Sequence, residues 1–266
     1  MCTALSHKTK ITELIDYFPF LQVDLLQEFD EERASYRLAF EHSEQPVIIS
    51  GDSGYEVRLF EWGVISNYMN TPESIKKNRA WMCNARAEKL ADSKSYWHKI
   101  KTQRCLVPAT GIYEHRRVKG FKNKIPYYVS LKNREMFCLP GLYNYSSIPD
   151  KDTGELTGTF SIITRAANPL MQLIHNDGEN KFRMPLFLPK EMEMEWIDPN
   201  TPWERILEIL SFEIADEELQ AWPVYTLNTP KPRPDGLLKN KPFQWPGLPQ
   251  LGEEGRGGLQ QSLFLT

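Results

Sequence analysis

The chain has 266 residues, of which 41% are apolar and 12% aromatic, with a formal net charge of -3 and a pI near 6.0. This composition supports a sizeable buried core and excludes both an intrinsically disordered chain and a protein that coats nucleic acid through its net charge. No stretch holds the ~20 apolar residues that a membrane span needs, and no basic-then-apolar signal pattern occurs at the start. We therefore expect a cytoplasmic protein with no membrane partner.

Short apolar runs bounded by turn residues predict strands, several of which alternate apolar and polar residues. In chain order these runs are residues 46–50, 57–65, 105–109, 126–131, 136–143, 159–164, 184–188 and 222–227. Apolar residues at three- or four-residue spacing predict helices at 9–17, 22–32, 72–78, 86–92, 168–175 and 203–211. Strands and helices do not alternate regularly, which excludes a Rossmann-type chain. We expect the α+β class: a single domain of mostly antiparallel sheet, distorted and barrel-like, with peripheral helices.

The composition changes after Leu227. Prolines recur through residues 230–249, and the sequence GEEGRGG follows at 252–258. A segment of this kind cannot build a core of its own. We therefore divide the chain into a domain, residues 1–228, and a C-terminal tail, residues 229–266, that lies on the surface and is then released.

The cysteines Cys2, Cys83, Cys105 and Cys138 are too scattered for a disulfide framework and form none of the close pairs of a zinc site. The three internal ones are expected to be small buried side chains. We expect no metal and no cofactor.

Basic residues gather between positions 99 and 134, where Glu114 is the only acid. Aromatic residues interrupt this stretch at Tyr113, Phe121, Tyr127 and Tyr128. Such a pattern suits phosphate neutralisation combined with base stacking. An exposed, lysine-rich hairpin without a nucleic-acid partner explains the same pattern, and the stretch alone does not decide between the two.

Cys2 becomes the N-terminal residue if Met1 is removed, which leaves an amine and a thiol two carbons apart. The ordinary pKa values are about 7.7–8.0 for the amine and about 8.5 for the thiol, so both are partly nucleophilic at neutral pH. With an aldehyde, this pair can close a five-membered thiazolidine. An N-terminal cysteine can also act as the nucleophile of an amidotransferase, with its amine as the base. A cysteine at position 2 can equally be without a role.

Several polar segments occur in a fixed order after Cys2. They are EWG at 61–63, NARAE at 84–88, RCLVPATGIYEH at 104–115, SIITRAAN at 161–168 and IHNDGENKFRMPLFL at 174–188. In this order, and over residues 1–228, they resemble the SOS response-associated peptidase (SRAP) family of abasic-site processing proteins. The resemblance implies an enzyme that removes its own Met1 and forms a thiazolidine crosslink between Cys2 and an abasic site in single-stranded DNA. It also implies a lyase or crosslink-reversal activity.

The resemblance assigns site residues by matching position. The catalytic set that it implies is Cys2, Asn84, Arg86, Glu114 and His175. We expect DNA contacts from Trp62, Arg86, His115, Thr164 and Arg183.

Each of these residues also has a structural explanation. Glu114 is suited to shuttle protons, and it could equally pair with Arg116 or Arg117. His175 is suited to proton transfer, or to capping the end of a helix. A planar guanidinium at Arg86 suits a phosphate, and a salt bridge to Glu88 is the alternative. A turn-capping role is the alternative for Asn84, and a core position is the alternative for Trp62.

Three features depart from the family pattern. Thr3 and Ala4 follow Cys2, where the family has Gly-Arg, so a basic DNA contact is missing. His115 follows the motif glutamate in place of a tryptophan, which predicts weaker or pH-dependent stacking. The segment 176–182 is an insertion between His175 and the RMP sequence, and we expect it to reshape the rim of the site.

The chain ends in QQSLFLT, and QQSLF resembles the peptide by which bacterial replication proteins bind the sliding clamp. A short apolar anchor on a Pro/Gly-rich tail can insert into a partner's pocket. We expect clamp contacts from Gln260, Ser262, Leu263 and Phe264. A frayed terminus, or a strand docked on the domain, is the alternative.

Two other functions remain open from the sequence. An N-terminal-nucleophile amidohydrolase also needs Cys2, but it would release ammonia from an amide such as glutamine. A non-covalent single-stranded DNA-binding module would not use Cys2 at all. The partner expected for the main hypothesis is single-stranded DNA that contains abasic sites.

Overall fold

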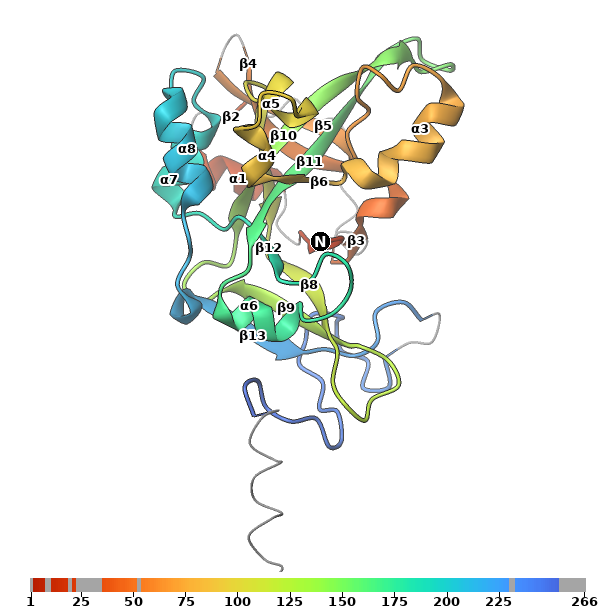
Figure 1. The fold of residues 1–266 in the computed structure, drawn as a ribbon, viewed down its shortest axis with the longest axis vertical. Coiled ribbons are helices and arrows are strands. Elements are labelled where there is room, and N and C mark those ends of the chain that lie inside the picture. Colours follow the sequence, from red (N-terminus) through yellow and green to blue (C-terminus); the bar gives the residue numbers. More distant parts are fainter. Residues whose placement is uncertain are drawn as a thin grey trace, which may run out of the picture.

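Two β-sheets form the frame of the protein (Figure 1). The computed structural model describes residues 2–7, 11–18, 21–22, 35–51, 54–229 and 233–253. The predicted clamp-binding residues Gln260, Ser262, Leu263 and Phe264 lie outside these ranges, as does most of the predicted helix 22–32. Along the described chain, no helix is both long and apolar enough to cross a membrane.

The first sheet has five strands in the order β13-β9-β8-β1-β3, and every neighbouring pair is antiparallel. Its strands are β1 (Ala4–Ser6), β3 (Arg37–Leu38), β8 (Gly111–Arg116), β9 (Ile125–Leu131) and β13 (Leu219–Pro223). The extended N-terminus is thus a central strand of this sheet, with β8 on one side and β3 on the other.

The second sheet follows the order β12-β11-β10-β7-β4-β5-β2, and β6 pairs with β11 beside this path. Most pairs are antiparallel, and β2 with β5, β5 with β11, and β6 with β11 are parallel. Its strands are β2 (Leu21–Gln22), β4 (Glu44–Gly51), β5 (Gly54–Trp62), β6 (Asn84–Arg86), β7 (Arg104–Ala109), β10 (Phe137–Pro149), β11 (Leu156–Ala166) and β12 (Arg183–Pro185).

Short helices lie around these sheets, so the predicted class is confirmed: a mostly antiparallel, barrel-like α+β domain with peripheral helices (Figure 1). The α-helices are α1 (Ile11–Tyr17), α3 (Pro72–Asn78), α4 (Ala87–Leu90), α5 (Tyr96–Lys99), α6 (Pro169–Ile174), α7 (Lys190–Ile197) and α8 (Trp203–Ser211). The 3-10 helices are η1 (Ala39–Glu41), η2 (Arg79–Met82) and η3 (Asp216–Glu218).

The helices that the sequence predicted best have clear N-terminal signals. Thr71 and Ser74 form a capping box at the start of α3, and Pro72 occupies its first turn. Asn168 caps α6, again followed by a proline. Helix α7 was not predicted, because its alternating glutamates and methionines give only a weak apolar face.

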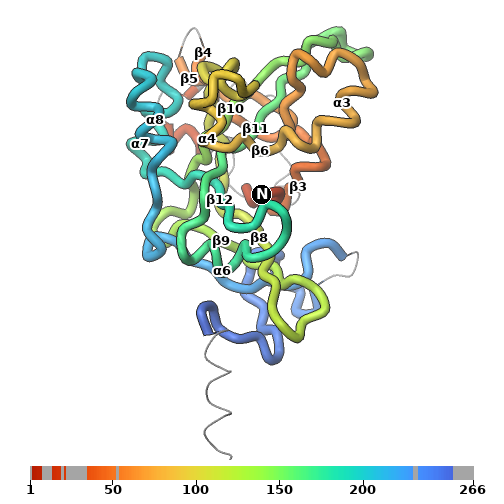
Figure 2. Tube along the Cα trace, viewed as in Figure 1, coloured from red at the N-terminus to blue at the C-terminus, as the bar shows by residue number. Residues whose placement is uncertain are grey.

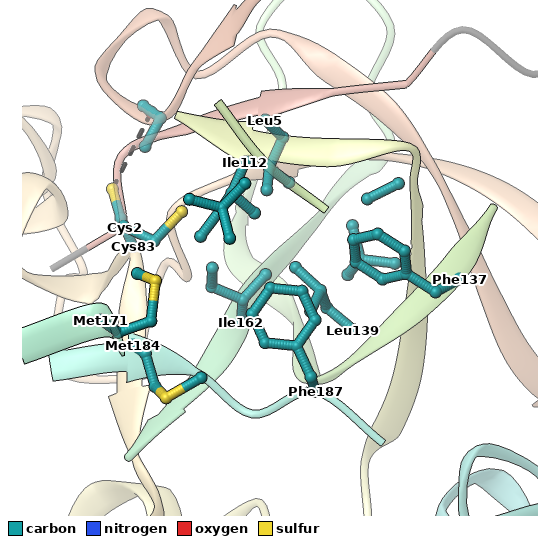
Figure 3. Close-up of a cluster of buried hydrophobic side chains, with 14 of the residues drawn as sticks. Cys2, Leu5, Cys83, Ile112, Phe137, Leu139, Ile162, Met171, Met184 and Phe187 are labelled. Carbon is teal, nitrogen blue, oxygen red and sulfur yellow. Dashed lines mark hydrogen bonds between the residues drawn. The ribbon is translucent and has the colours of Figure 1, made fainter. Parts of the chain in front are cut away.

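The largest apolar cluster draws side chains from both sheets (Figure 3). Leu5 and Ile112 come from the first sheet, and Leu139 and Ile162 from the second. Burial of apolar surface contributes about 25 cal/mol per Å2, so this shared core fixes the two sheets against each other. Cys2 and Cys83 lie together at one end of the cluster.

Residues 233–253 pack beside the first sheet, at the lower end of the view in Figure 2. Phe243 N donates to Pro223 O at 2.8 Å, and Trp245 Nε1 donates to Val224 O at 2.9 Å. The side chains of Trp245, Leu248 and Leu251 pack against the largest apolar cluster. This part of the predicted tail therefore lies on the surface of the domain.

Candidate functional site around Cys2

Cys2 is buried two residues before strand β1. Its Sγ atom donates to Ala4 O at 3.6 Å, and the neighbouring Thr3 O accepts from Ala39 N at 2.9 Å. Burial, followed by the negative charge of Glu114, raises the pKa of the Cys2 thiol well above its ordinary value. The thiol is therefore protonated at neutral pH in this state of the protein.

Cys83 is the side chain beside Cys2 that sequence reasoning did not assign to the site (Figure 3). Its Sγ atom donates to Ala39 O at 3.8 Å, so Ala39 links it to the backbone that follows Cys2. Burial raises the pKa of the Cys83 thiol to about 12. Cys83 is thus an inert, protonated neighbour, and its position directly before NARAE was the only signal in the sequence.

Glu114 approaches Cys2 because β1 and β8 are paired. The register joins Leu5 to Ile112, and its extension by two residues sets Glu114 opposite Thr3. Glu114 is only 4% exposed, and its Oε1 atom has no hydrogen-bond partner among the described residues. Burial raises the pKa of this carboxyl to about 8, although the positive N-terminus and Lys124 act in the opposite direction. Glu114 can therefore exchange a proton near neutral pH.

The two arginines considered as ion-pair partners of Glu114 donate to other acceptors in the structure. Arg116 donates to Tyr127 Oη at 2.7 Å and to the carbonyl groups of Pro249 and Gln250 at 3.1 Å. Arg117 donates to Asp177 at 3.3 Å.

Asn84 begins β6, which pairs in parallel with β11 through Ile162. Its side chain is 5% exposed, and neither Nδ2 nor Oδ1 has a hydrogen-bond partner within the described part of the chain. A buried amide without partners is destabilising by about 1–3 kcal/mol, and the capping role considered for Asn84 would have satisfied it. The unpaired amide is therefore available to a bound molecule.

His175 follows the last residue of α6. Its Nδ1 atom lies 2.7 Å from Arg183 O. Because a carbonyl only accepts, Nδ1 carries the proton and Nε2 carries the lone pair. Burial, followed by the positive N-terminus, lowers the pKa of His175 to about 4. His175 is therefore a neutral imidazole at pH 7, able to accept a proton at Nε2.

The two arginines of the site bind different acceptors. Arg86 is exposed, and its Nη2 atom donates to Asn180 Oδ1 at 2.9 Å. Glu88, considered as a partner for Arg86, instead receives Nη1 and Nη2 of Arg183 at 2.5 and 3.0 Å. Arg183 Nη2 also donates to Thr164 O at 2.7 Å. Strand β11 carries β6 and β12 on its two edges, which brings these groups together.

The structure corrects two of the expected DNA contacts. Trp62 is fully buried, its Nε1 atom donates to Cys83 O at 2.8 Å, and its ring stacks on Phe160. No face of this indole is open to a base, so Trp62 supports the Cys83 backbone from within the core. The side chain of Thr164 is also fully buried, between β6 and β12, and cannot reach a phosphate.

His115 is half-buried next to Glu114, and burial, followed by Lys124, lowers its pKa. The imidazole of His115 therefore becomes charged only at a pH below the ordinary pKa of histidine, and any pH dependence of its stacking is expected there.

The insertion 176–182 binds basic residues of the rim. Asp177 pairs with Arg117 at 3.3 Å and with Lys124 at 3.1 Å, while Asn180 holds Arg86. Asn176 exchanges two hydrogen bonds with the backbone of Arg117. The insertion thus connects the β8–β9 hairpin to the site. The sequence predicted only that the insertion reshapes the rim, and not which residues it binds.

The chemistry of the site follows from these groups. Cys2 supplies a thiol, Glu114 a carboxyl that titrates near neutrality, His175 a neutral imidazole, and Asn84, next to Cys83, an amide unpaired among the described residues. Arg86 and Arg183 add guanidinium groups. Among the residues that the structure describes, no three His, Cys, Asp or Glu side chains converge as a metal site. The arrangement can join a nucleophile to a carbonyl carbon and move the protons that this addition requires.

Comparisons with known proteins show which family this fold belongs to. Residues 1–228 match the model of the SOS response associated peptidase (SRAP) family. The abasic site processing protein YoqW of Bacillus subtilis is 29% identical over 241 residues, which cover 90% of this chain and all of YoqW. Its relative YobE is 29% identical and covers 87% of this chain and 98% of YobE.

Solved structures show the same fold. A protein from Bacteroides thetaiotaomicron is 33% identical with a TM-score of 0.73, and the match covers 84% of this chain and 92% of that protein. A Bordetella bronchiseptica protein, 19% identical, has a TM-score of 0.68 over 85% of this chain and all of that protein. The chain belongs to the SOS response associated peptidase family.

Proposed function

We propose that this protein processes abasic sites in DNA, and that it does so by trapping them covalently on Cys2 in single-stranded DNA. Family membership and the name "abasic site processing protein" carried by its relatives support the DNA substrate. The observation that carries the covalent step is a set of buried polar atoms that have no partner among the described residues: both side-chain polar atoms of Asn84, which follows Cys83, and Oε1 of Glu114, whose charge acts on Cys2.

The reaction begins with hydrolysis of the Met1–Cys2 peptide bond, which consumes one water and frees the Cys2 amine. That amine adds to the aldehyde carbon C1′ of the ring-opened deoxyribose and loses one water to give an imine. The Cys2 sulfur then adds to the same carbon, and the thiol proton moves to nitrogen. The product is a thiazolidine, in which carbon is bonded to both sulfur and nitrogen.

Each neighbouring side chain has a role in this sequence. Protonated Glu114 donates to the departing hydroxyl as the imine forms, and its carboxylate then takes the proton of the thiol and passes it to the nitrogen. Neutral His175 accepts the C1′ hydroxyl proton at Nε2 as the ring opens and passes it to the ring oxygen, and the reverse transfer closes the sugar ring again after release. For strand cleavage, His175 removes a C2′ proton from the imine while the 3′ phosphate departs. Asn84 binds the sugar or the chain terminus through its amide, and Arg86 binds a phosphate.

A denaturing gel tests the proposal. Mature protein incubated with single-stranded DNA that contains one abasic site should give a shifted band that survives denaturation. Cys2→Ala should give no band. A strand with a tetrahydrofuran site, which has no aldehyde, should also give no band with either protein. Absence of a band with the native protein would contradict the covalent step and leave non-covalent binding. Ammonia release from glutamine without a band would favour the amidohydrolase.

The amine provides a second test. Intact mass should show that Met1 is absent from the active protein. Selective acetylation of the Cys2 amine, with the thiol left free, should abolish the stable band because an amide nitrogen cannot form the imine. An unchanged band after acetylation would move the linkage to the thiol alone.

The C-terminal peptide supports a further part of the proposal, delivery to replication forks through the sliding clamp. The last twelve residues should bind the clamp, and the Leu263→Ala, Phe264→Ala double variant should not. Equal binding by the two peptides would reject this role.

A further inference from the structure

Phe182 is an exposed aromatic residue at the end of the insertion that joins α6 to β12. Its side chain is 42% exposed, and its backbone φ angle is +60°. Few residues other than glycine adopt this left-handed conformation, and bulky ones do so rarely. Such a conformation persists where the surrounding structure enforces it, and it is enriched at functional sites.

Two hydrogen bonds hold Phe182 in place. Its N–H donates to His175 O at 2.8 Å, and its carbonyl accepts from Ala167 N at 2.9 Å. Both partners lie at the ends of the segment that contains α6. The backbone of Phe182 is therefore fixed to the residues at the two ends of α6, next to His175.

The neighbours of Phe182 are the cationic groups of the site. Arg183 follows it directly and binds Glu88 and Thr164 O. Asn180, two residues earlier, receives Arg86. Lys181 places its Nζ atom 5.1 Å from the centroid of the Phe182 ring. An aromatic face next to guanidinium and ammonium groups is the combination that binds a base together with its phosphate.

We propose that Phe182 stacks on the nucleobase adjacent to the abasic site and so positions the strand for attack by Cys2. This inference rests on the proposed function and supplies the stacking contact that the buried Trp62 cannot make. Lys181, whose Nζ atom lies beside the ring, supplies a cation for a phosphate of the same strand. The ring thereby selects for a strand that has a base next to the gap.

The test measures binding without chemistry. Anisotropy would give the Kd of single-stranded oligonucleotides with a tetrahydrofuran site, in which the flanking bases are either present or themselves replaced by tetrahydrofuran. Phe182→Asn removes the ring and tolerates the left-handed backbone. It should weaken binding by at least about fivefold when the flanking bases are present, the lower end of one base–aromatic stack. Phe182→Trp keeps an aromatic ring and should therefore bind the same strands as tightly as the native protein does.

The controls separate stacking from misfolding and from failure of the proposed function. Leu156→Ala removes an exposed apolar side chain from the β10–β11 hairpin and should leave the Kd unchanged. Native protein and Phe182→Asn should bind equally when the flanking bases are absent. Equal Kd values on every strand, or the same loss on every strand, would overturn the role of Phe182. A native protein that never crosslinks would overturn only the covalent step.

Discussion

Among the described residues, the buried side chain of Asn84 has no hydrogen-bond partner, and the buried carboxyl of Glu114 has none at Oε1. Burial of such groups opposes folding. Core positions without a chemical role therefore favour apolar residues. Trp62 shows the contrast within the same site, since its indole N–H is fully used by Cys83 O. At the residue scale, the unpaired polar atoms of Asn84 and Glu114 oppose folding, whereas the paired indole of Trp62 stabilises the core.

Asn84→Leu tests this opposition directly. Leucine has a similar size and removes a buried amide without partners, so the melting temperature should rise by about 2–4 °C for each kcal/mol recovered. Crosslinking should fall strongly. Asn144 is the matched control, because its buried Nδ2 atom donates to Ile65 O at 2.7 Å. Asn144→Leu should lower the melting temperature, and a rise in both variants would show that partners are irrelevant.

Glu114→Gln tests the role of the carboxyl in proton transfer. The crosslinking rate of the native protein should fall as the pH rises through about 8, because the protonated acid is lost there. Glu114→Gln should lower the rate at pH 7 by about 100-fold or more and remove this dependence. Single-turnover rates between pH 6 and 9 measure both effects. If the rate of the variant still falls near pH 8, the fall belongs to the titration of another group.

The same substitution has a stability readout. The pKa of Glu114 is raised in the folded state, so its contribution to stability is present below pH 4.5 and is lost as the pH rises through about 8. Glu114→Gln should therefore become increasingly more stable than the native protein over this range. Thermal melts at pH 5 and pH 8.5 provide the comparison.

At the scale of elements, the insertion 176–182 binds cations of the basic rim. Asp177 occupies Arg117 and Lys124, two cations that would otherwise face phosphates. Asp177→Asn should therefore tighten single-stranded DNA binding severalfold at low salt and steepen its salt dependence by up to about 0.7 for each released cation. Asp152→Asn removes the same charge from the exposed β10–β11 turn and controls for net charge. Equal effects of the two variants would contradict a local role.

The elements that could be predicted are those whose signal is local. Helices α3 and α8 and strands β4, β7 and β9 have apolar periodicity bounded by caps or turns. Strand β1 could not be predicted, because three residues form a strand only when β3 and β8 lie on either side. The parallel pairing of β6 with β11 is equally non-local.

The site could be predicted only as a set of motifs. The resemblance identified Cys2, Asn84, Glu114 and His175 as site residues. The order of the motifs along the chain does not say how these side chains lie relative to one another. Whether an aromatic residue faces the core or the solvent depends on the packing of the whole fold, so Trp62 was wrongly expected at the surface. The contacts of the insertion also depend on tertiary structure, since Asn180 reaches Arg86 across two strands.

At the scale of the whole molecule, residues 233–253 continue the packing of the first sheet. Arg116 is fully buried beneath them, and its guanidinium donates to the carbonyl groups of Pro249 and Gln250. A buried cation needs such acceptors. Because Arg116 and Glu114 lie on the same strand, this segment also supports the strand that carries the carboxyl of the site.

Truncation at two positions tests that support. Removal of residues 229–266 leaves Arg116 without both carbonyl acceptors and strips Trp245 from the core, so the melting temperature should fall by at least about 6 °C, given two charge-assisted hydrogen bonds of about 1.5–3 kcal/mol each. Removal of residues 254–266 keeps every one of these contacts and should leave the melting temperature unchanged. Differential scanning calorimetry of the three chains makes the comparison. If the chain without residues 229–266 has the same melting temperature as the full chain, these residues do not stabilise the domain, and Arg116 has sufficient hydrogen-bond partners within residues 1–228.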